Sequence, residues 1–460
     1  MKQEQSLEMF DKMPVAKAVI KNALPAIAAM LMVLTYNLAD TFFIGQTHDD
    51  LQVAAVSIAT PIFLIFTAIG TIFGIGGTSM ISRSFGERKP DYAKKVCSFC
   101  MWSCVFVGVI MSILFLIFMD NILRLVGTSE DIWGLAKSYL TIVSLCGPFV
   151  LISNCYSNIL RAEGQSVKAM LGTLIGNMLN VILDPIFILV FKMNIAGAAI
   201  ATVIGNIVGA LYYIMYYLRG NSVLSINIRD FTIKDKICSG VLAIGIPASL
   251  GSILMSLSQI IVNSQMAHYG DMALAGIGVA MKMTMITSML AMGLGQGVQA
   301  LLGYCVGAKN WDRFKAIMKF SFCAAFLLSV LTTALCYIFN SQIIGVFLTD
   351  TASFEYASNF SKILLTTSAL FGIFYILINA LQAMGAATPS LIVNISRQGL
   401  IYIPSLFILQ AIMGVNGLVW SQPVADVLSL LLAISLYTAI LKKIKSTQIG
   451  GMQIEKSDIE

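Results

Sequence analysis

Five ionisable side chains lie well inside long apolar stretches of the sequence. They are Asp40, Asp184, Lys282, Arg397 and Asp426. An ionisable group that faces hydrocarbon is costly, so such residues usually pair with one another or bind an ion or a ligand. Carboxylate oxygens suit a hard cation such as sodium, and a carboxylate shielded from water can carry a proton instead. These five residues therefore point to the binding of ions or protons.

Amide side chains accompany the two aspartates of the N-terminal half at helical spacing. Asn177, Asn180 and Asp184 follow an i, i+3, i+7 pattern, so one face of a helix would carry all three. Asn37 lies three residues before Asp40 and would share its face. At a rise of about 1.5 Å per residue, counted from the preceding lysines, both carboxylates fall in the outer half of their segments. We therefore expect them to reach one polar site at similar depth.

Pro185 directly follows Asp184 and changes what the backbone offers there. Proline has no N–H, so the carbonyl of Val181 would lose its helical partner and could coordinate a cation or bind water. Two plainer interpretations stay open. Asp184 could only cap the kink at Pro185, and Asp40 could be an interfacial residue near an outer loop. The sequence does not decide between a sodium ion and a proton.

Further polar and flexible side chains could line a cavity beside these carboxylates. The segment 133–160 carries amide and hydroxyl side chains at helical spacing, and methionines on the segment 272–304 could form an adaptable wall. Hydrogen bonds between helices and ordinary packing would account for the same residues, so these alternatives stay open. The candidate cavity residues are Asn37, Asn154, Ser157, Asn158, Asn177, Lys282, Met285 and Met289.

The remaining three ionisable residues belong to the C-terminal half. Lys282 and Asp426 each lie about 14 Å from the outer end of their segments, so we expect them to form a buried pair that lines a cleft. Arg397 lies about eight residues from the inner end of its segment, and its long side chain could reach water there. We therefore expect a structural role for Arg397.

The composition indicates what kind of protein holds these residues. Of 460 residues, 58% are hydrophobic and 11% are charged, and the mean hydropathy is +0.85. A soluble domain has roughly 25% charged residues, so this chain could not cover a water-facing surface. Nine cysteines are too sparse for a disulfide-stabilised secreted fold, and a net charge of +6 drawn from short clusters disfavours nucleic-acid binding. A polytopic membrane protein remains.

Twelve apolar runs are long enough to cross a membrane, which takes about 20 residues per helix. Their continuous hydrophobicity excludes a β-barrel, whose strands alternate. We therefore expect an all-α membrane protein with twelve transmembrane helices. The runs are 17–45, 51–82, 96–119, 133–160, 168–191, 195–218, 237–267, 272–304, 316–339, 358–383, 389–411 and 415–441.

The connections between these runs differ in charge. Most of the 29 Lys and Arg residues fall in the N-terminal segment, in every second connection and in the C-terminal segment. Short cytoplasmic loops are the ones that carry excess Lys and Arg. We therefore expect a multi-pass protein of the plasma membrane with both termini in the cytoplasm.

The chain also repeats itself at a constant offset. Gly76 and Gly297 lie 221 residues apart in matching contexts, and so do Asn158 and Asn379. Two halves with an even number of spans are parallel repeats, which can rock about a site between them. We expect two pseudo-symmetric six-helix lobes. The predicted parts are an N-terminal lobe at 1–222, a cytoplasmic linker at 223–236, a C-terminal lobe at 237–445 and a cytoplasmic tail at 446–460.

Taken in order, several motifs resemble those of the multidrug and toxic compound extrusion (MATE) family. They are "LP" in the first run, "GxG" followed by "RSxG" after the second, "RAEG" after the fourth and "LNVILDP" in the fifth. The resemblance covers about 12–445. It is greatest to the branch with acidic residues in the N-terminal lobe, because Asp40 projects onto Val262 in the second half and the seventh run has no carboxylate.

The resemblance implies a cation site and a transport activity. The family members export organic cations and amphipathic compounds, driven by inward sodium or proton flow. In the matching branch the cation site, for sodium or a proton, corresponds to the side chains of Asp40, Asn180, Asp184 and Thr202 and the backbone carbonyl of Ala198. With sodium as the coupling ion, the four side chains would be its metal ligands.

We therefore expect a secondary antiporter and not an enzyme. No P-loop is present, so ATP would not drive transport directly, and no nucleophile–base set lies at membrane depth. The alternative within the same superfamily is a flippase for a lipid or lipid-linked oligosaccharide. Expected partners are small-molecule drugs or organic cations and membrane lipids, with no nucleic acid and no cofactor beyond the coupling ion. A monomer would suffice.

Overall fold

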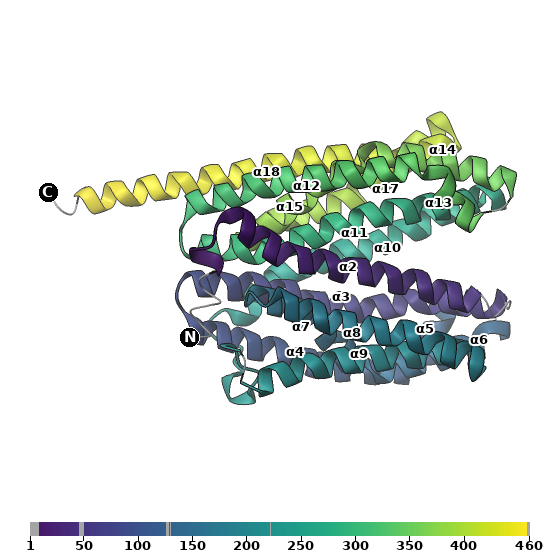
Figure 1. The fold of residues 1–460 in the computed structure, drawn as a ribbon, viewed down its shortest axis with the longest axis horizontal. Coiled ribbons are helices and arrows are strands. Elements are labelled where there is room, and N and C mark those ends of the chain that lie inside the picture. The colour runs from purple at the N-terminus through teal and green to yellow at the C-terminus, as the bar shows by residue number, and fades with distance from the viewer. Residues whose placement is uncertain are drawn as a thin grey trace.

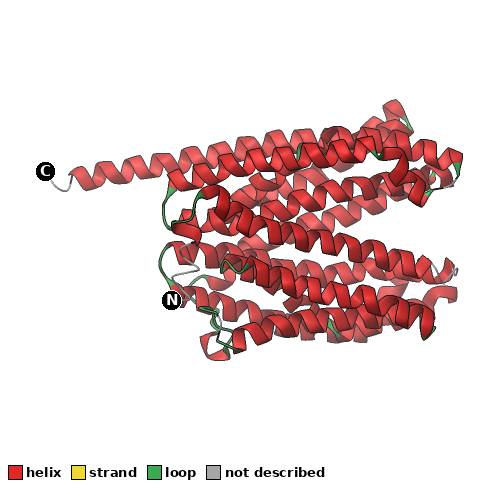
Figure 2. Ribbon diagram, viewed as in Figure 1, coloured by secondary structure: helices red, strands yellow, loops and turns green. Residues whose placement is uncertain are grey.

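The protein forms a helical bundle in the computed structural model, which describes residues 9–45, 50–125, 128, 130–220, 222–348 and 350–457. Within these ranges every regular element is a helix (Figure 2). The first half contains α2 (Val15–Gly45), α3 (Asp50–Gly86), α4 (Pro90–Ile117), α5 (Met119–Leu125), α6 (Glu130–Leu145), α7 (Gly147–Ala162), α8 (Ser166–Pro185), the π-helical turn η1 (Ile186–Val190) and α9 (Asn194–Leu218). The second half contains α10 (Ile237–Ala267), α11 (Asp271–Gly307), α12 (Trp311–Ile338), α13 (Asn340–Phe347), α14 (Thr351–Ser368), α15 (Phe371–Ala383), α16 (Ala387–Ile395), the π-helical turn η3 (Ser396–Leu400), α17 (Tyr402–Met413) and α18 (Val415–Ser457).

The helices confirm the all-α membrane fold and refine two of its spans. In the described part of the chain, ten spans are long and apolar enough to cross a membrane, and two bent helix pairs bring the number to twelve. The pair α6–α7 bends by 59° and the pair α14–α15 by 48°. These pairs correspond to the predicted runs 133–160 and 358–383, which are therefore broken rather than continuous helices.

Each break has a local cause. Pro148 follows directly after Gly147 in the first turn of α7, where its missing N–H costs no helical hydrogen bond, so a new helix begins there. At the second break, the N–H of Gly372 in the first turn of α15 donates to the Ser329 hydroxyl of α12 at 3.0 Å. A hydroxyl from a neighbouring helix thus satisfies a backbone donor that the bend leaves open.

The helices form two lobes that lie side by side (Figure 1). The N lobe comprises α2 to α9 and the C lobe comprises α10 to α18, with the colour changing from purple and teal to green and yellow. Between the lobes, α2 packs on α11 and α3 packs on α10. Two six-span lobes meeting along these four helices confirm the expected two-lobe fold.

The backbone repeats between the lobes at the predicted offset. Arg88 and Lys309, 221 residues apart, both adopt a left-handed conformation with φ of 58° and 55°. Gly164 and Gly385, at the same offset, have φ of 79° and 72°. Such φ values favour glycine, which explains the glycine in the turn that follows α7 and in the matching turn that follows α15. The π-helical turns η1 and η3 do not follow this offset, so the lobes differ there.

The two lobes touch near the end of the bundle that carries both termini, here called the terminal end (Figure 1). The Asn22 amide donates to the Gly297 carbonyl at 2.5 Å, and the Ser79 hydroxyl donates to the Gln382 carbonyl at 2.5 Å. A Cβ at Gly297 would collide with Ala23 of α2. The absence of a side chain at Gly297 therefore lets the two helices approach closely here.

The segment between the lobes is ordered against the N lobe. Ser98 on α4 donates to the Asn227 carbonyl at 2.6 Å, and the Trp102 indole donates to the Ile226 carbonyl at 3.1 Å. Phe231 stacks on Phe99 with their ring centroids 5.9 Å apart. The predicted linker 223–236 thus packs along α4 and includes a short 3-10 helix, η2 (Ile228–Asp230). At the other end of the C lobe, α18 continues as a helix into the predicted tail.

Glu163, just beyond α7, fixes the start of this segment and should make stability depend on pH. Its carboxylate accepts hydrogen bonds from the Ser222 hydroxyl at 2.5 Å and the Val223 N–H at 3.0 Å. Burial raises the pKa of Glu163 from 4.5 to about 7, against the lowering effect of these hydrogen bonds. A raised carboxyl pKa means that folding favours the protonated form. Stability is therefore lost as the pH rises through 7 and is regained toward pH 4.5.

Glu163→Gln keeps an acceptor for both donors but removes the buried charge. We expect it to raise the melting temperature at pH 8, by the equivalent of up to about 3 kcal/mol, and by only about a quarter of that at pH 5. Thermal unfolding in detergent from pH 5 to pH 9 measures this. Parallel melting curves for the variant and the wild type across that range would show that Glu163 is not the titrating group.

Candidate ion-binding site

Three helices of the N lobe bring the predicted cation-site residues together. Asp40 lies near the far end of α2, Asn180 and Asp184 lie in the second half of α8, and Ala198 and Thr202 lie in the first half of α9. The helix α8 packs on both α2 and α9. Asp184 has no exposed surface, Asn180 and Thr202 are buried, and Asp40 is partly buried.

The packing of α8 against α9 depends on two small residues. The backbones of Gly176 and Gly205 approach so closely that a Cβ on either glycine would collide with the carbonyl oxygen of the other. Asn180 lies one turn further along α8, with its Cβ against Gly205. Its amide Nδ2 donates to the Thr202 hydroxyl at 3.2 Å. The glycines thus hold the polar stripe of α8 within hydrogen-bonding distance of α9.

The site contains buried oxygens that lack hydrogen-bond donors. Among the described residues, neither carboxylate oxygen of Asp184 has a hydrogen-bond partner, nor does Oδ1 of Asp40 or Oδ1 of Asn180. The two carboxylates are close enough for their charges to interact. Buried acceptors without donors are costly. A sodium ion fits this set of oxygens and would satisfy them, and a proton on one carboxylate would relieve the repulsion between the two.

The π-helical turn after Pro185 supports the site from its far side. The helix α8 runs through Pro185 and passes directly into η1. Ile188 of η1 packs with Ala198 of α9 and with Phe43 near the end of α2. A small apolar cluster therefore joins η1 to α9 and α2, the helices that carry Ala198, Thr202 and Asp40.

Two tyrosines also belong to the site, and the sequence analysis missed them. Tyr36 on α2 lies within hydrogen-bonding reach of Thr202 and close to the charges of Asp40 and Asp184. Tyr139 on α6 is buried and faces the same charges. The i−4 spacing of Tyr36 from Asp40 could have identified it. Tyr139 lies on α6, and no spacing in the sequence linked it to Asp40 or Asp184.

The other polar residues predicted for the N lobe lie at different places. Asn37 donates to the Val33 carbonyl of its own helix at 2.9 Å, and the buried Nδ2 of Asn177 has no hydrogen-bond partner in the described part of the chain. Asn154 lies where α7 packs on Gly70 of α3. Ser157 donates to the Asn154 carbonyl at 2.9 Å. Asn154 and Ser157 thus lie in or beside the contact between α3 and α7.

Asn158 takes part in the contact between the lobes. Its Oδ1 accepts a hydrogen bond from Arg161 at 2.9 Å, and the same guanidinium nitrogen donates to Gln296 of the C lobe at 3.1 Å. Arg161 is 2% exposed. This network joins α7 to α11 and lies toward the terminal end, so the structure gives Asn158 a part in holding the lobes together.

In the C lobe, the expected pair between Lys282 and Asp426 is wrong. Asp426 instead binds Arg397, with Nε and Oδ1 2.8 Å apart and both side chains buried. Lys282 Nζ lies 4.9 Å from the centre of the Phe347 ring. Arg397 lies in the π-helical turn η3. Its side chain is buried, so the expectation that it reaches water at the end of its helix is wrong as well. Met285 and Met289 are half-buried on α11.

Further contacts complete the surroundings of this ion pair. Gln422 donates to Asp426 Oδ1 at 3.0 Å, and Thr367 donates to Oδ2 at 3.2 Å. The Arg397 guanidinium lies 4.8 Å from the ring centres of both Phe371 and Phe374. Both carboxylate oxygens of Asp426 thus have a donor, unlike those of Asp184. The C lobe therefore offers no comparable open set of acceptors around this carboxylate.

Comparisons with known proteins agree with this architecture. The MatE family model matches the chain twice, over residues 25–186 and 247–408. The multidrug export proteins MepA of Staphylococcus aureus (strain MRSA252) and of Staphylococcus saprophyticus are 34% and 31% identical over 433 and 437 residues, which cover 94% of this chain and 95% of each relative.

Solved structures show the same fold. An outward-facing conformation of a multidrug resistance MATE family transporter superposes with a TM-score of 0.91 at 22% identity, covering 96% of this chain and 99% of that chain. A MOP superfamily transporter from Pyrococcus furiosus gives a TM-score of 0.89 at 23% identity, with the same coverage. With two family matches across most of its length and relatives above 30% identity, the chain belongs to the multidrug and toxic compound extrusion (MATE) family.

Proposed function

We propose that this protein is a secondary antiporter that exports organic cations and amphipathic drugs in exchange for inward sodium ions or protons. The observation that carries the proposal is the set of buried, donor-free oxygens around Asp40 and Asp184. The names of the MepA relatives, which are multidrug export proteins, support the class of substrate.

We assign the terminal end of the bundle to the cytoplasm because the predicted loops at that end carry most of the Lys and Arg. The lobes meet at this end, through Asn22, Ser79 and Arg161. The carboxylates of Asp40 and Asp184 lie in the far halves of their helices. On this assignment the conformation is closed toward the cytoplasm, and the candidate ion site lies in the half of the protein nearer the outside.

Exchange would follow from competition for negative charge. A sodium ion or proton that enters from outside would neutralise Asp40 and Asp184 and favour closure of the lobes over the outer half. A cationic drug and the coupling ion would then stabilise different states of the same lobes. For an uncharged drug, one charge that moves inward through about 100 mV yields roughly 2.3 kcal/mol, which supports a roughly fortyfold drug gradient. Exchange of one sodium ion or proton for one singly charged drug moves no net charge, so the concentration gradient of the ion supplies the energy in that case.

Drug efflux from vesicles that contain the purified protein tests the proposal. A pH gradient and a sodium gradient are imposed separately, and the movement of a fluorescent organic cation is followed. We expect one of the two gradients to drive efflux and thereby to identify the ion. If neither gradient moves an organic cation, the antiporter proposal is wrong, and the lipid-flippase alternative should be tested with labelled lipids.

The close contact at Gly297 predicts how the lobes respond to one added methyl group. Gly297→Ala would place a Cβ against Ala23 and weaken closure at the terminal end. We expect the population of molecules that are open at the terminal end to rise several-fold. Spin labels at Lys94→Cys and Lys319→Cys, in a background without native cysteines, would report this as longer distances between the two lobes. Gly278→Ala is the matched control, because a Cβ at Gly278 on the same helix meets nothing within 4 Å. Equal distance distributions for the two variants would contradict the prediction.

A further inference from the structure

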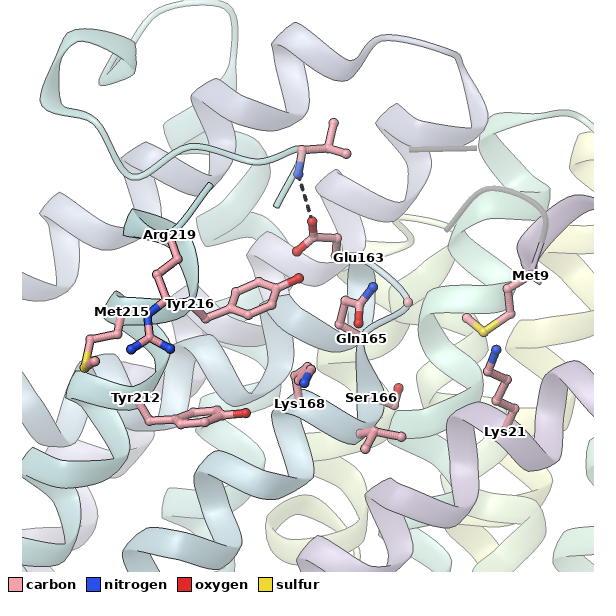
Figure 3. A pocket seen from close by; sticks show the side chains of 13 residues that line it. Met9, Lys21, Glu163, Gln165, Ser166, Lys168, Tyr212, Met215, Tyr216 and Arg219 are labelled. Atoms are coloured by element: carbon pink, nitrogen blue, oxygen red, sulfur yellow. Dashed lines mark hydrogen bonds between the residues drawn. The ribbon is translucent and has the colours of Figure 1, made fainter. Parts of the chain in front are cut away.

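A basic pocket opens at the terminal end of the N lobe, away from the cation site. It lies between α2, α8, α9 and the turn that follows α7, with a volume of about 590 Å³. Figure 3 shows Arg219, Lys168 and Lys21 spread across it, with Tyr212 and Tyr216 beside Arg219. These three cations come from three different helices or helix ends, so the fold rather than the local sequence brings them to one pocket.

The cations of this pocket are not neutralised by the protein. Among the described residues, Lys21, Lys168 and Arg219 form no ion pair, and all three are exposed. Among the described residues that line the pocket, Glu163 carries the one carboxylate, and it accepts hydrogen bonds from Ser222 and Val223 of the segment between the lobes. The pocket therefore presents more positive than negative charge and suits an anion such as a phosphate group.

The surface beside the pocket is apolar and exposed. Leu24 lies one turn from Lys21 on α2 and is 61% exposed. Leu218 precedes Arg219 at the end of α9 and is 71% exposed, and Met215 lies on the same face of α9. Such side chains on the outside of a transmembrane bundle contact acyl chains. A soluble phosphate would make no use of this surface, whereas a phospholipid would use both parts.

We propose that this pocket binds the phosphate of an anionic phospholipid from the membrane leaflet on the cytoplasmic side. The phosphate would contact the cations at Lys21, Lys168 and Arg219, and the acyl chains would lie along the apolar faces of α2 and α9. This is a second site, and it rests on the membrane orientation assigned above but not on the coupling ion or the drug.

The position of the pocket gives such a lipid a specific effect. Lys21 stands on α2, which carries Asp40, and Lys168 stands on α8, which carries Asp184. Arg219 caps α9, which carries Thr202. Each of the three helices that carry the predicted cation-site residues therefore has one end at the pocket and contributes one cation there. A single headgroup bound by all three would hold these helices together at the end opposite the ion site.

Lipid titration with the full-length protein tests this proposal. Phosphatidylglycerol is added to the protein in neutral detergent, and bound lipid is counted by native mass spectrometry, with phosphatidylcholine as the zwitterionic reference. The test variant carries Lys21→Gln, Lys168→Gln and Arg219→Gln. The control variant removes the same charge from exposed residues at the same end of the bundle through Arg229→Gln, Lys234→Gln and Lys319→Gln.

We expect the test variant to bind phosphatidylglycerol roughly 100-fold more weakly than the wild type, and the control variant to bind it within about twofold. If the triple variant does not fold, Lys168→Gln and Arg219→Gln alone should each weaken binding about fivefold. Equal binding by test and control variants would overturn the proposal. Displacement of the lipid by millimolar inorganic phosphate would instead indicate a site for soluble phosphate. Loss of ion-driven efflux with lipid binding intact would bear only on the antiporter.

Discussion

Asp184→Asn and Asp40→Asn should each lower ion-driven efflux at least about 100-fold, the equivalent of about 3 kcal/mol lost from a buried charged contact. Either change removes one of the two negative charges that a sodium ion or proton would neutralise. Asparagine keeps the size of the side chain, so the packing of α2 on α8 should persist. Efflux from vesicles under the gradient that drives the wild type measures the effect.

A matched control separates this effect from a general loss of negative charge. Asp120→Asn removes an exposed carboxylate that pairs with Lys137 at 2.7 Å, far from Asp40 in the sequence. We expect it to transport within about twofold of the wild type, because exposed ion pairs contribute little. If Asp184→Asn kept wild-type efflux under both gradients, the donor-free oxygens would need another occupant, and the N lobe would not be where the ion couples.

The difference between the two aspartate substitutions would itself be informative. Asp184 is fully buried, with both oxygens lacking donors, whereas Asp40 has one such oxygen and is partly buried. A proton needs one carboxylate, while a sodium ion needs several oxygens at once. Equal losses for both variants would favour sodium. A residual, slower exchange in Asp40→Asn alone would favour a proton carried by Asp184.

The sequence predicted that several polar residues of the N lobe lie together because helical periodicity determines their shared faces; their role in ion binding stays a prediction. Asn180 and Asp184 are one turn apart, so their shared face follows from the spacing alone, and the structure confirms that both are buried. The family resemblance then supplied Thr202, which does contact Asn180. The outcome for Tyr139 was different, because it lies on α6, a helix whose sequence carries no polar spacing that links it to α2, α8 or α9. Which face of α6 meets these helices depends on the tertiary packing.

The C lobe shows the limit of counting depth along straight helices. Lys282 and Asp426 have similar calculated depths, yet depth says nothing about which faces of the helices meet. The π-helical turn η3 inserts a change of register at Arg397, and its guanidinium comes to lie against Asp426 and two phenylalanine rings. Since π-helical turns have no dependable sequence signal, the ion pair could be found only in three dimensions.

Breaking the ion pair between Arg397 and Asp426 should be strongly destabilising. Arg397→Met leaves the Asp426 carboxylate buried with only Gln422 and Thr367 as donors. An uncompensated buried charge costs about 3–5 kcal/mol, so we expect a large drop in melting temperature. Adding Asp426→Leu to that variant removes the orphaned charge. The double variant should regain most of the lost stability, because a buried pair replaced by apolar side chains is often close to neutral.

Lys137 and Asp120 provide the comparison that isolates burial as the cause. Their separation of 2.7 Å nearly equals the 2.8 Å between Arg397 and Asp426, but their side chains are 46% and 55% exposed against 8% and 3%. Lys137→Met should therefore cost less than about 1 kcal/mol. Melting temperatures of the wild type and these three variants in one detergent complete the comparison. If Arg397→Met melted like Lys137→Met, the buried pair would contribute nothing specific. Asp426 would then accept a proton or a ligand as readily as it accepts Arg397, and the C lobe would hold a second open carboxylate.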